Sequence, residues 1–380
     1  MSPGPAPAPP GRWLKANGFK AFVPDPLPPR LDWTPDLVRA LSEADQLVGR
    51  LAGEASGLPN PHLFIRPFLA REAVLSSKIE GTQATLGELL AADAGIAVDR
   101  SPADLREVGN YVVAMEHGLR RLRTLPLSLR LVRELHQKLM RGVRGDVATP
   151  GDFRRSQNWV GPAGAGPARA TYVPPPPDAL MDCLGAWEKF LHDRSLPPLA
   201  QAALAHYQFE AIHPFLDGNG RVGRLLIILF LIERKVLPAP LLYLSAFFEA
   251  TRDQYYARLL AVTMTGDWEA WLRYFLLGTA RMAQDVLRRA ERINRTLAAW
   301  RRRLAGTPRG SVVLLDALAQ NPFVSAKTAS DRLKLAFTTA QRAIATLERA
   351  SILQQVAGDR RGRVYCAKAL LKVLEEPARL

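Results

Sequence analysis

The residues from His213 to Arg224 have the types and spacing that phosphoryl-transfer chemistry needs. A Gly-Asn-Gly turn at 218–220 leads directly into an apolar run, which is typical of a helix start. Free backbone N–H groups and the helix dipole make such a start a binding site for anions, above all for phosphate. Arg221 and Arg224 would add charge-assisted hydrogen bonds to the same phosphates.

Side chains within and just before the turn could act on a bound nucleotide. His213 has the pKa range of a general base, so it could take a proton from an incoming hydroxyl. Asp217 is placed to hold a magnesium ion that bridges phosphate oxygens. Gly218 and Gly220 allow the backbone to approach the phosphates closely, and Asn219 would add an amide donor. The sequence thus predicts a base, a metal ligand and an anion cradle around one triphosphate.

Residues 213–224 read HPFLDGNGRVGR and resemble the HPFx(D/E)GNGRxxR signature of the Fic family at every fixed position. The resemblance implies a mainly α fold, with a Fic-type helical core and a small β-hairpin flap. It implies transfer of AMP from ATP to a Ser, Thr or Tyr hydroxyl of a protein, including itself, with Mg2+ held by Asp217 and the γ-phosphate held by Arg224. The catalytic and ATP-binding positions that it carries over are His213, Asp217, Gly218, Asn219, Gly220, Arg221 and Arg224. Retention of the Gly-Asn-Gly-Arg pattern favours AMP transfer over phosphorylation.

Segments on both sides of the motif also resemble the family. Residues 151–154, 158–161 and 172–176 resemble its flap, which aligns the target chain beside the nucleotide by strand-like pairing. A Pro-rich surface loop is the alternative interpretation. Downstream, the resemblance places Tyr255 or Tyr256 near the adenine, although aromatic side chains on a helix belong more often to the core.

A second motif lies in the N-terminal region. Residues 71–82 read as the end of a helix that Gly81 stops, and the spacing of four places Ser76 and Glu80 on one helix face. This pattern resembles the (S/T)xxxE(G/N) inhibitory motif of the same family, which implies an inhibitory helix at about 67–81. The resemblance further implies that Glu80 pairs with Arg224 and so removes the partner of the γ-phosphate. Relatives often form homodimers that hold this helix in place.

Apolar residues that recur at three- and four-residue steps predict a mainly α chain. We expect five regions: a flexible N-terminal tail (1–30), a helical region with the inhibitory helix (31–115), the catalytic core (116–280), a basic linker helix (281–306) and a winged helix-like domain (307–380).

The composition excludes several kinds of protein. Cys183 and Cys366 are far apart, so neither a disulfide framework nor a zinc site is expected, and a reducing cytoplasm is the simplest location. The longest apolar run, 225–232, is much shorter than the ~20 residues that cross a bilayer, so no membrane span is expected. The net charge of +15 permits a polyanionic partner.

The end of the chain has a different pattern from the core. Predicted helices at 312–319, 326–333 and 339–349, followed by predicted strands at 352–356 and 363–366, resemble a winged helix-turn-helix domain. Its third helix and its hairpin would present basic and polar side chains to DNA, namely Gln341, Arg342, Arg349, Arg360, Arg361 and Arg363. A protein–protein or dimerisation module is an equally open interpretation.

Three functions therefore remain open at this point. The first is a protein adenylyltransferase with a built-in inhibitory helix. The second is a DNA-binding transcriptional regulator that uses the Fic core as an ATP sensor. The third is an enzyme that mainly removes AMP, with Glu80 positioning a water. The sequence does not identify the target protein, the modified residue or the oligomeric state.

Overall fold

The computed structural model describes residues 9–16, 18–57, 62–96, 98, 102–143, 149–162, 164, 166–358 and 362–379. Its helices are α1 (Pro35–Gly57), α2 (His62–Ile79), α3 (Leu86–Asp93), α4 (Pro102–Arg121), α5 (Leu129–Leu139), α6 (Pro177–Leu191), α7 (Pro198–Ile212), α8 (Asn219–Glu233), α9 (Ser245–Ala250), α10 (Arg252–Thr265), α11 (Trp268–Arg303), α12 (Arg309–Gln320), α13 (Ala326–Leu333), α14 (Phe337–Arg349), α15 (Lys368–Glu375) and the short 3-10 helix η1 (Pro167–Arg169). Its strands are β1 (Gly11–Ala16), β2 (Phe19–Pro24), β3 (Phe323–Ser325), β4 (Gln354–Ala357) and β5 (Val364–Cys366). The mainly α fold class predicted from the sequence is confirmed.

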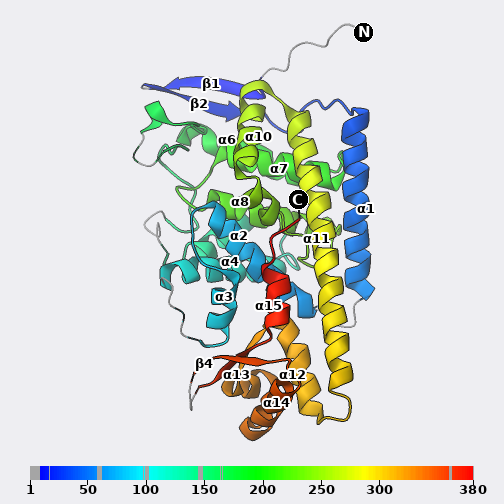
Figure 1. The fold of residues 1–380 in the computed structure, drawn as a ribbon. Helices are drawn as coiled ribbons and strands as arrows, with labels where there is room; N and C mark the ends of the chain where they lie inside the picture. The colour runs from blue at the N-terminus through cyan, green and yellow to red at the C-terminus, as the bar shows by residue number, and fades with distance from the viewer. Residues whose placement is uncertain are drawn as a thin grey trace.

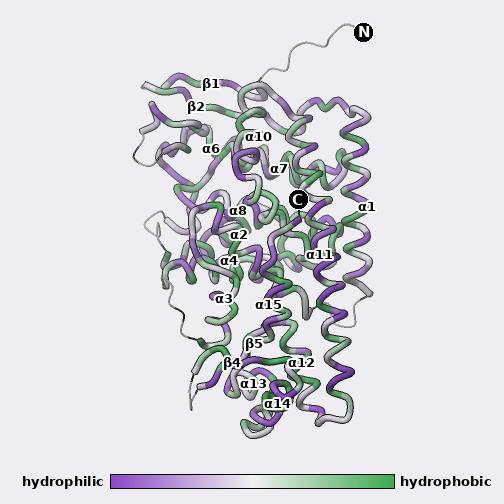
Figure 2. Tube along the Cα trace, viewed as in Figure 1, coloured by the Kyte–Doolittle hydropathy of each residue, from purple (hydrophilic) through white to green (hydrophobic). Residues whose placement is uncertain are grey.

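The molecule is elongated, with the β1–β2 hairpin at one end and helices α12 to α14 at the other (Figure 1). Helix α11 runs along the long axis, and α1 packs against it. The tube in Figure 2 alternates between hydrophilic and hydrophobic residues along α11, because one side of this helix faces the core and the other faces solvent. One cluster of buried apolar side chains extends from β2 through the central helices into the C-terminal helices.

Helices α7 and α8 form the centre of the molecule and are joined by residues 213–218. Nearly all of their residues are buried, as expected for helices that are apolar on every side. The chain enters α8 through Gly218, whose φ of 77° lies in the left-handed region that glycine adopts without strain. The predicted apolar run 225–232 lies inside α8, and no helix of the described residues is long and apolar enough to span a bilayer.

The prediction of a flexible tail over residues 1–30 is wrong for the hairpin β1–β2, whose two strands pair along their whole length. Trp13 packs on Phe22 with ring centroids 5.0 Å apart, and Phe22 packs on Tyr172 at 6.4 Å. The Phe22 N–H also donates to the Val173 carbonyl at 2.9 Å. These contacts join segments far apart in the sequence, which the Pro/Ala-rich composition of the N-terminus does not reveal. The first eight residues lie outside the described part of the chain.

The predicted flap segments pair with each other, but only over a short stretch. In the described residues the pairing is one isolated antiparallel bridge between Val160 and Tyr172, not an extended hairpin. The Tyr172 hydroxyl donates to the Ala211 carbonyl at 2.6 Å, and the Arg154 N–H donates to the Pro214 carbonyl at 2.9 Å. The flap is thereby fastened to the end of α7 and to the start of the His213–Arg224 motif.

The C-terminal unit consists of α12, α13 and α14 with a three-stranded antiparallel sheet of order β3-β5-β4. The sequence analysis anticipated three helices and two strands here, whereas β3 and α15 are additional. Helix α14 buries one apolar face and leaves Gln341, Arg342 and Arg349 exposed. Arg360 and Arg361 lie outside the described residues.

Two of the expected region boundaries fall inside helices. Helix α4 continues from Pro102 to Arg121, and α11 is unbroken from Trp268 to Arg303. The catalytic region and the expected basic linker helix therefore share one helix, which gives a direct mechanical connection between the core and the C-terminal unit.

Candidate active site

The loop between α7 and α8 is closed by the side chain of Asn219. Its Oδ1 accepts a hydrogen bond from the Phe215 N–H, and its Nδ2 donates to the Phe215 carbonyl, both at 2.8 Å. The predicted role of Asn219 as a phosphate donor does not fit this geometry, because both ends of its amide are bonded within the loop and the residue is buried. The first intrahelical bond runs from the Val222 N–H to the Gly218 carbonyl at 3.0 Å, so the N–H groups of residues 219–221 precede the bonded part of the helix.

Hydrogen bonds hold the backbone carbonyl of His213, and a separate contact of its ring determines the tautomer. Its φ is 49°, and its carbonyl accepts hydrogen bonds from Arg154 Nε at 2.9 Å and Asn158 Nδ2 at 3.2 Å. The ring Nδ1 lies 3.3 Å from the Glu210 carbonyl, which can only accept, so Nδ1 carries the proton and Nε2 has a free lone pair. Burial lowers the pKa of His213 to about 4, which keeps the ring neutral at pH 7.

Arg221 is a buried cation with unused donors. Its side chain is 4% exposed and lies 3.6 Å from the carboxylates of Glu107 and Asp217, longer than a good hydrogen bond. Its Nε and Nη1 have no hydrogen-bond partner among the described residues. Because buried polar groups are normally paired, these two N–H groups indicate a site for an anion.

Asp217 is the acidic side chain of the motif and is 48% exposed. Its Oδ1 accepts the Gly218 N–H at 2.6 Å, which leaves lone pairs on the carboxylate directed to solvent. The described residues contain no group of three His, Cys, Asp or Glu side chains that would bind a metal ion by themselves. A single carboxylate fits Mg2+, which is commonly bound by one or two carboxylates together with substrate phosphates and water.

The expected inhibitory contact is present. Arg224 is 2% exposed; its Nη2 donates to Glu80 Oε1 at 2.7 Å and to the Ser76 carbonyl at 2.9 Å, and its Nε donates to Ser76 Oγ at 2.9 Å. Burial raises the pKa of Glu80 and the adjacent Arg224 lowers it, with a net decrease that keeps the carboxylate charged. A Cβ on Gly220 would lie 2.3 Å from Glu80 Oε1, so Glu80 sits directly over the glycine turn.

The two tyrosines proposed for the adenine differ in position. Tyr255 is 1% exposed, stacks on Phe248 with centroids 4.5 Å apart, and its hydroxyl bonds to His206 Nε2 at 2.8 Å. The choice of Tyr255 as an ATP-binding residue is therefore not supported, because its ring belongs to the core. Tyr256 is 42% exposed and has Arg252 over its ring at 5.9 Å, so it is the accessible aromatic of the pair.

His136 of α5 was not singled out by the sequence. Its ring stacks on Phe215 with centroids 3.7 Å apart. Its Nδ1 accepts the Gly151 N–H at 2.9 Å, so its Nε2–H donates to the Asp217 carbonyl at 3.1 Å. His136 thus fastens the catalytic loop to the flap, and a lone histidine in an amphipathic helix gives no sequence signal for that role.

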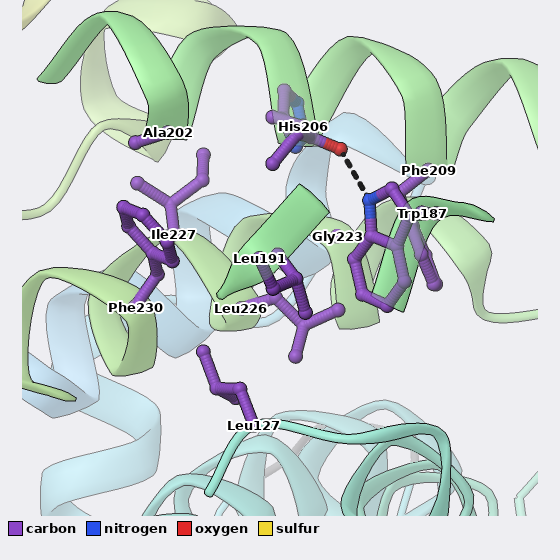
Figure 3. A pocket seen from close by; sticks show the side chains of 11 residues that line it. Leu127, Trp187, Leu191, Ala202, His206, Phe209, Gly223, Leu226, Ile227 and Phe230 are labelled. Atoms are coloured by element: carbon purple, nitrogen blue, oxygen red, sulfur yellow. Dashed lines mark hydrogen bonds between the residues drawn. The ribbon is translucent and has the colours of Figure 1, made fainter. Parts of the chain in front are cut away.

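Figure 3 shows a cavity behind this site, between α6, α7 and α8. Its walls are mostly apolar, and the Trp187 Nε1–H beside it is already bonded to the Ala205 carbonyl at 2.9 Å. With a volume of about 20 Å³ it has room for roughly one water molecule, so it is a packing defect and not a nucleotide site.

Comparisons with known proteins agree with this geometry. The models of the "Fic/DOC family N-terminal" region and of the "Fic/DOC family" match residues 38–120 and 126–231. "Protein adenylyltransferase Fic" of Drosophila virilis and that of Drosophila grimshawi are each 32% identical over 202 residues, which is 52% of this chain and 38% of the relative. The chain thus spans less than half the length of the curated relatives that it matches.

Solved structures show the same fold. A Fic family protein from Desulfovibrio desulfuricans G20 superposes with a TM-score of 0.61 at 21% identity, covering 90% of this chain and 98% of that one. Fic-1 (aa134–508) from C. elegans superposes with a TM-score of 0.51 at 24% identity, covering 68% of this chain and 74% of that one. Residues 38–120 and 126–231, which include the intact His213–Arg224 motif, therefore belong to the Fic/DOC family.

Proposed function

We propose that this chain is a protein adenylyltransferase, which transfers AMP from ATP to a hydroxyl group of a protein, itself included. The observation that carries the proposal is the buried guanidinium of Arg221, which has two unpaired donors and belongs to the first turn of α8. Each buried unpaired donor costs about 1–3 kcal/mol, and a bound triphosphate would remove that cost. The names of the Drosophila relatives, which match half of the chain, support the same activity.

His213 acts as the general base in this proposal. Its free Nε2 takes the proton of a Ser, Thr or Tyr hydroxyl while the hydroxyl oxygen forms a bond to the α-phosphorus. The bond from the α-phosphorus to the bridging oxygen breaks, and pyrophosphate leaves. The bonds from Arg154 and Asn158 to the His213 carbonyl hold the backbone of this residue in place during this step.

The helix start and two arginines would hold the triphosphate. The N–H groups of residues 219–221 and the unpaired donors of Arg221 both belong to the first turn of α8, and Arg224 would hold the γ-phosphate once it is free. Asp217 would hold Mg2+, which supplies positive charge to the phosphate oxygens when it is bound.

Glu80 and Ser76 act as a brake on this reaction. Arg224 has its Nε and Nη2 bonded to helix α2, so these donors are withheld from a γ-phosphate. ATP would then bind with its phosphates displaced from the geometry that transfer needs. The exposed Tyr256 is the aromatic side chain that would contact the adenine.

The test is incubation of the chain with labelled ATP, UTP, GTP or CTP and magnesium, followed by mass spectrometry of the chain and of a host lysate. We expect AMP on a hydroxyl side chain, with ATP as the donor, and no label on His213→Ala. Label that persists in His213→Ala would remove the general base from the proposal. Net release of AMP from a modified protein by the wild type, lost in Glu80→Gly, would favour AMP removal as the main direction.

A second candidate is duplex DNA binding through the C-terminal unit, which we interpret as a winged helix-turn-helix. The observation that favours it is the exposed polar face of α14, where the side chains of Gln341 and Arg342 have no hydrogen-bond or ion-pair partner among the described residues. Such a face is the usual reader of a major groove. Salt-sensitive duplex binding lost in Arg342→Ala would support it, and binding unchanged by that substitution would exclude α14 as the reader.

We also propose a reducing compartment and a homodimer. The buried free thiols of Cys183 and Cys366 suit a reducing compartment such as the cytoplasm. A homodimer that steadies α2 would be detected by sedimentation of the full chain.

A further inference from the structure

Helix α2, which carries Ser76 and is followed directly by Glu80, is bounded on its outer side by the C-terminal end of the chain. Helix α15 packs on α2, α3 and α11, and the chain then runs alongside α11 (Figure 1). We call residues 375–379 the C-terminal strap. The strap and the inhibitory helix are neighbours in space although they lie at opposite ends of the sequence.

The strap is fastened to α11 by Arg289, a buried residue that is 3% exposed. Its guanidinium donates to the Glu376 carbonyl at 2.7 Å and the Pro377 carbonyl at 3.1 Å, and also to the Val373 carbonyl at the end of α15. Its Nε donates to the Asp285 carboxylate at 2.6 Å. One side chain thus fixes the path of the backbone at the start of the strap.

Arg71 of α2 reaches the same junction. Its Nη2 donates to the Glu376 carbonyl at 3.4 Å, and its Nη1 lies 3.8 Å from the Asp285 carboxylate. Burial, with Arg289 nearby, lowers the pKa of Arg71 to about 10. Two buried guanidinium groups therefore share the Asp285 carboxylate, and the strap carbonyls supply further acceptors. Without the strap, both arginines would lose acceptors, and α2 would keep only the 3.8 Å contact between Arg71 and Asp285 as its link to α11 at this point.

The strap also contacts the chain beyond the inhibitory helix. Glu375 Oε1 accepts the Gly87 N–H, in the first turn of α3, at 3.0 Å. Arg71 precedes Glu80 in the sequence and Gly87 follows it, so the strap holds the chain on both sides of the brake.

A cleft of about 490 Å³ lies between the outer side of α2, helix α9 and the strap. Leu75 and Lys78 of α2 line it, and an ion pair between Lys78 and Glu249 crosses it at 2.8 Å. Since this side of α2 faces a cleft and not a packed core, the end of α2 has room to tilt away from Arg224 once the strap is loose.

We propose that the C-terminal strap positions the inhibitory helix, with Arg71 and Arg289 as positioning residues, and that displacing the strap weakens the grip of Ser76 and Glu80 on Arg224. The C-terminal unit, which ends in the strap, thereby sets the strength of the brake. This inference rests on the proposed AMP transfer for its activity readout, but its structural readout is independent.

Two variants of the full chain cut the connection from opposite sides. Combined Glu375→Gly, Glu376→Gly and Pro377→Gly removes the Gly87 contact and makes the strap flexible. Arg71→Met keeps the strap on Arg289 but frees α2. The matched control is Arg379→Gly, an exposed strap residue for which the described residues offer no hydrogen bond or ion pair. We expect each cutting variant to raise initial self-labelling with ATP about fivefold, the equivalent of about one lost hydrogen bond, and the control to stay within about twofold of wild type.

The brake itself provides the decisive comparison. In the Glu80→Gly background the strap variants should give a clearly smaller increase, because only the Ser76 bonds to Arg224 remain to be weakened. An equal rise in both backgrounds, or no rise in either cutting variant, would overturn the proposal. A loss of rate in both backgrounds would mean a structural role only, and would also overturn it.

Hydrogen exchange tests the strap without any activity. The hydrogen-exchange protection factors of amides 74–80 should fall about tenfold in both cutting variants. They should not change in Arg379→Gly. Unchanged protection in both cutting variants would refute the proposed role of the strap, even if their self-labelling rates rose as expected. If Glu80→Gly fails to label at all, the proposed function fails, and this exchange measurement still decides the role of the strap.

Discussion

Graded removal of the Glu80 and Ser76 contacts to Arg224 should release AMP transfer in a fixed order. Glu80→Gly removes the carboxylate, Glu80→Gln keeps an acceptor but loses the charge, and Ser76→Ala removes only the hydroxyl that accepts from Arg224 Nε. The Ser76 carbonyl still accepts from Arg224 Nη2 in every variant. We expect the self-labelling rate to be highest for Glu80→Gly and to fall through Glu80→Gln and Ser76→Ala to the wild type.

The size of each step follows from the bonds lost. A hydrogen bond to a charged group contributes about 1.5–3 kcal/mol. The Glu80 side chain is 34% exposed, so the lower part of that range applies, about 1.5–2 kcal/mol. At 1.4 kcal/mol per factor of ten, Glu80→Gly should raise the initial rate by about 10–30-fold. Ser76→Ala loses a bond in which only the guanidinium is charged, at the bottom of the same range, about 1.5 kcal/mol, and should raise the rate by about tenfold.

The assay is the initial rate of label transfer from ATP to the chain, measured at equal protein concentrations. The control is Glu249→Gln in α9. It breaks the partly exposed ion pair with Lys78 of α2 and should change the rate by less than about twofold. Equal rates in wild type and Glu80→Gly, with label still dependent on His213, would refute the brake. A larger effect for Ser76→Ala than for Glu80→Gly would show that the hydroxyl and not the carboxylate controls Arg224.

Three further outcomes follow from the site. Arg221→Met should raise the ATP dissociation constant by about 10–100-fold in calorimetry, while the thermal midpoint of the apo chain stays equal or rises because unpaired buried donors are removed. Asp217→Asn should lower magnesium-dependent transfer at least about tenfold in the Glu80→Gly background without changing apo stability, since its side chain is half exposed. Burial lowers the pKa of His206 to about 3, so at pH 5 the unfolded chain binds a proton that the folded chain does not, and stability falls as the pH falls. His206→Phe should therefore reduce the slope of unfolding free energy against pH by about 1.3 kcal/mol per unit near pH 5, as urea titrations would show.

The parts of the site that are local in sequence were predictable. The glycine turn at 218–220 and the apolar run after it predict the start of α8, and the helix begins there. The spacing of Ser76 and Glu80 places both on one face of α2, and both bond to the same guanidinium. The pairing of Glu80 with Arg224 spans 144 positions, so it came from family resemblance and not from the pattern of the residues.

Contacts that depend on packing were not predictable. Asn219 looks like a free amide in the sequence, but its side chain closes the loop onto Phe215. Tyr255 and Tyr256 are adjacent, and only tertiary packing decides that the first is buried and the second exposed. The hairpin β1–β2 was missed because the ring contact between Phe22 and Tyr172 has no local signal.

The polar side chains at the end of α2 explain how this helix would serve as the proposed brake. Glu72, Ser76 and Glu80 lie one turn apart on that face, and Glu72 is bonded to the Ser245 hydroxyl at 2.5 Å and to Tyr111 at 3.2 Å. An apolar face would contribute about 1.5–3 kcal/mol per buried side chain and would resist separation. The hydrogen bonds of this face go to charged groups and contribute about 1.5–3 kcal/mol each, but water can replace them when the contact opens. The Ser76 and Glu80 bonds to Arg224 can therefore break at a cost that nucleotide binding or release of the strap can supply, while apolar residues of α2 such as Phe68 stay packed in the core.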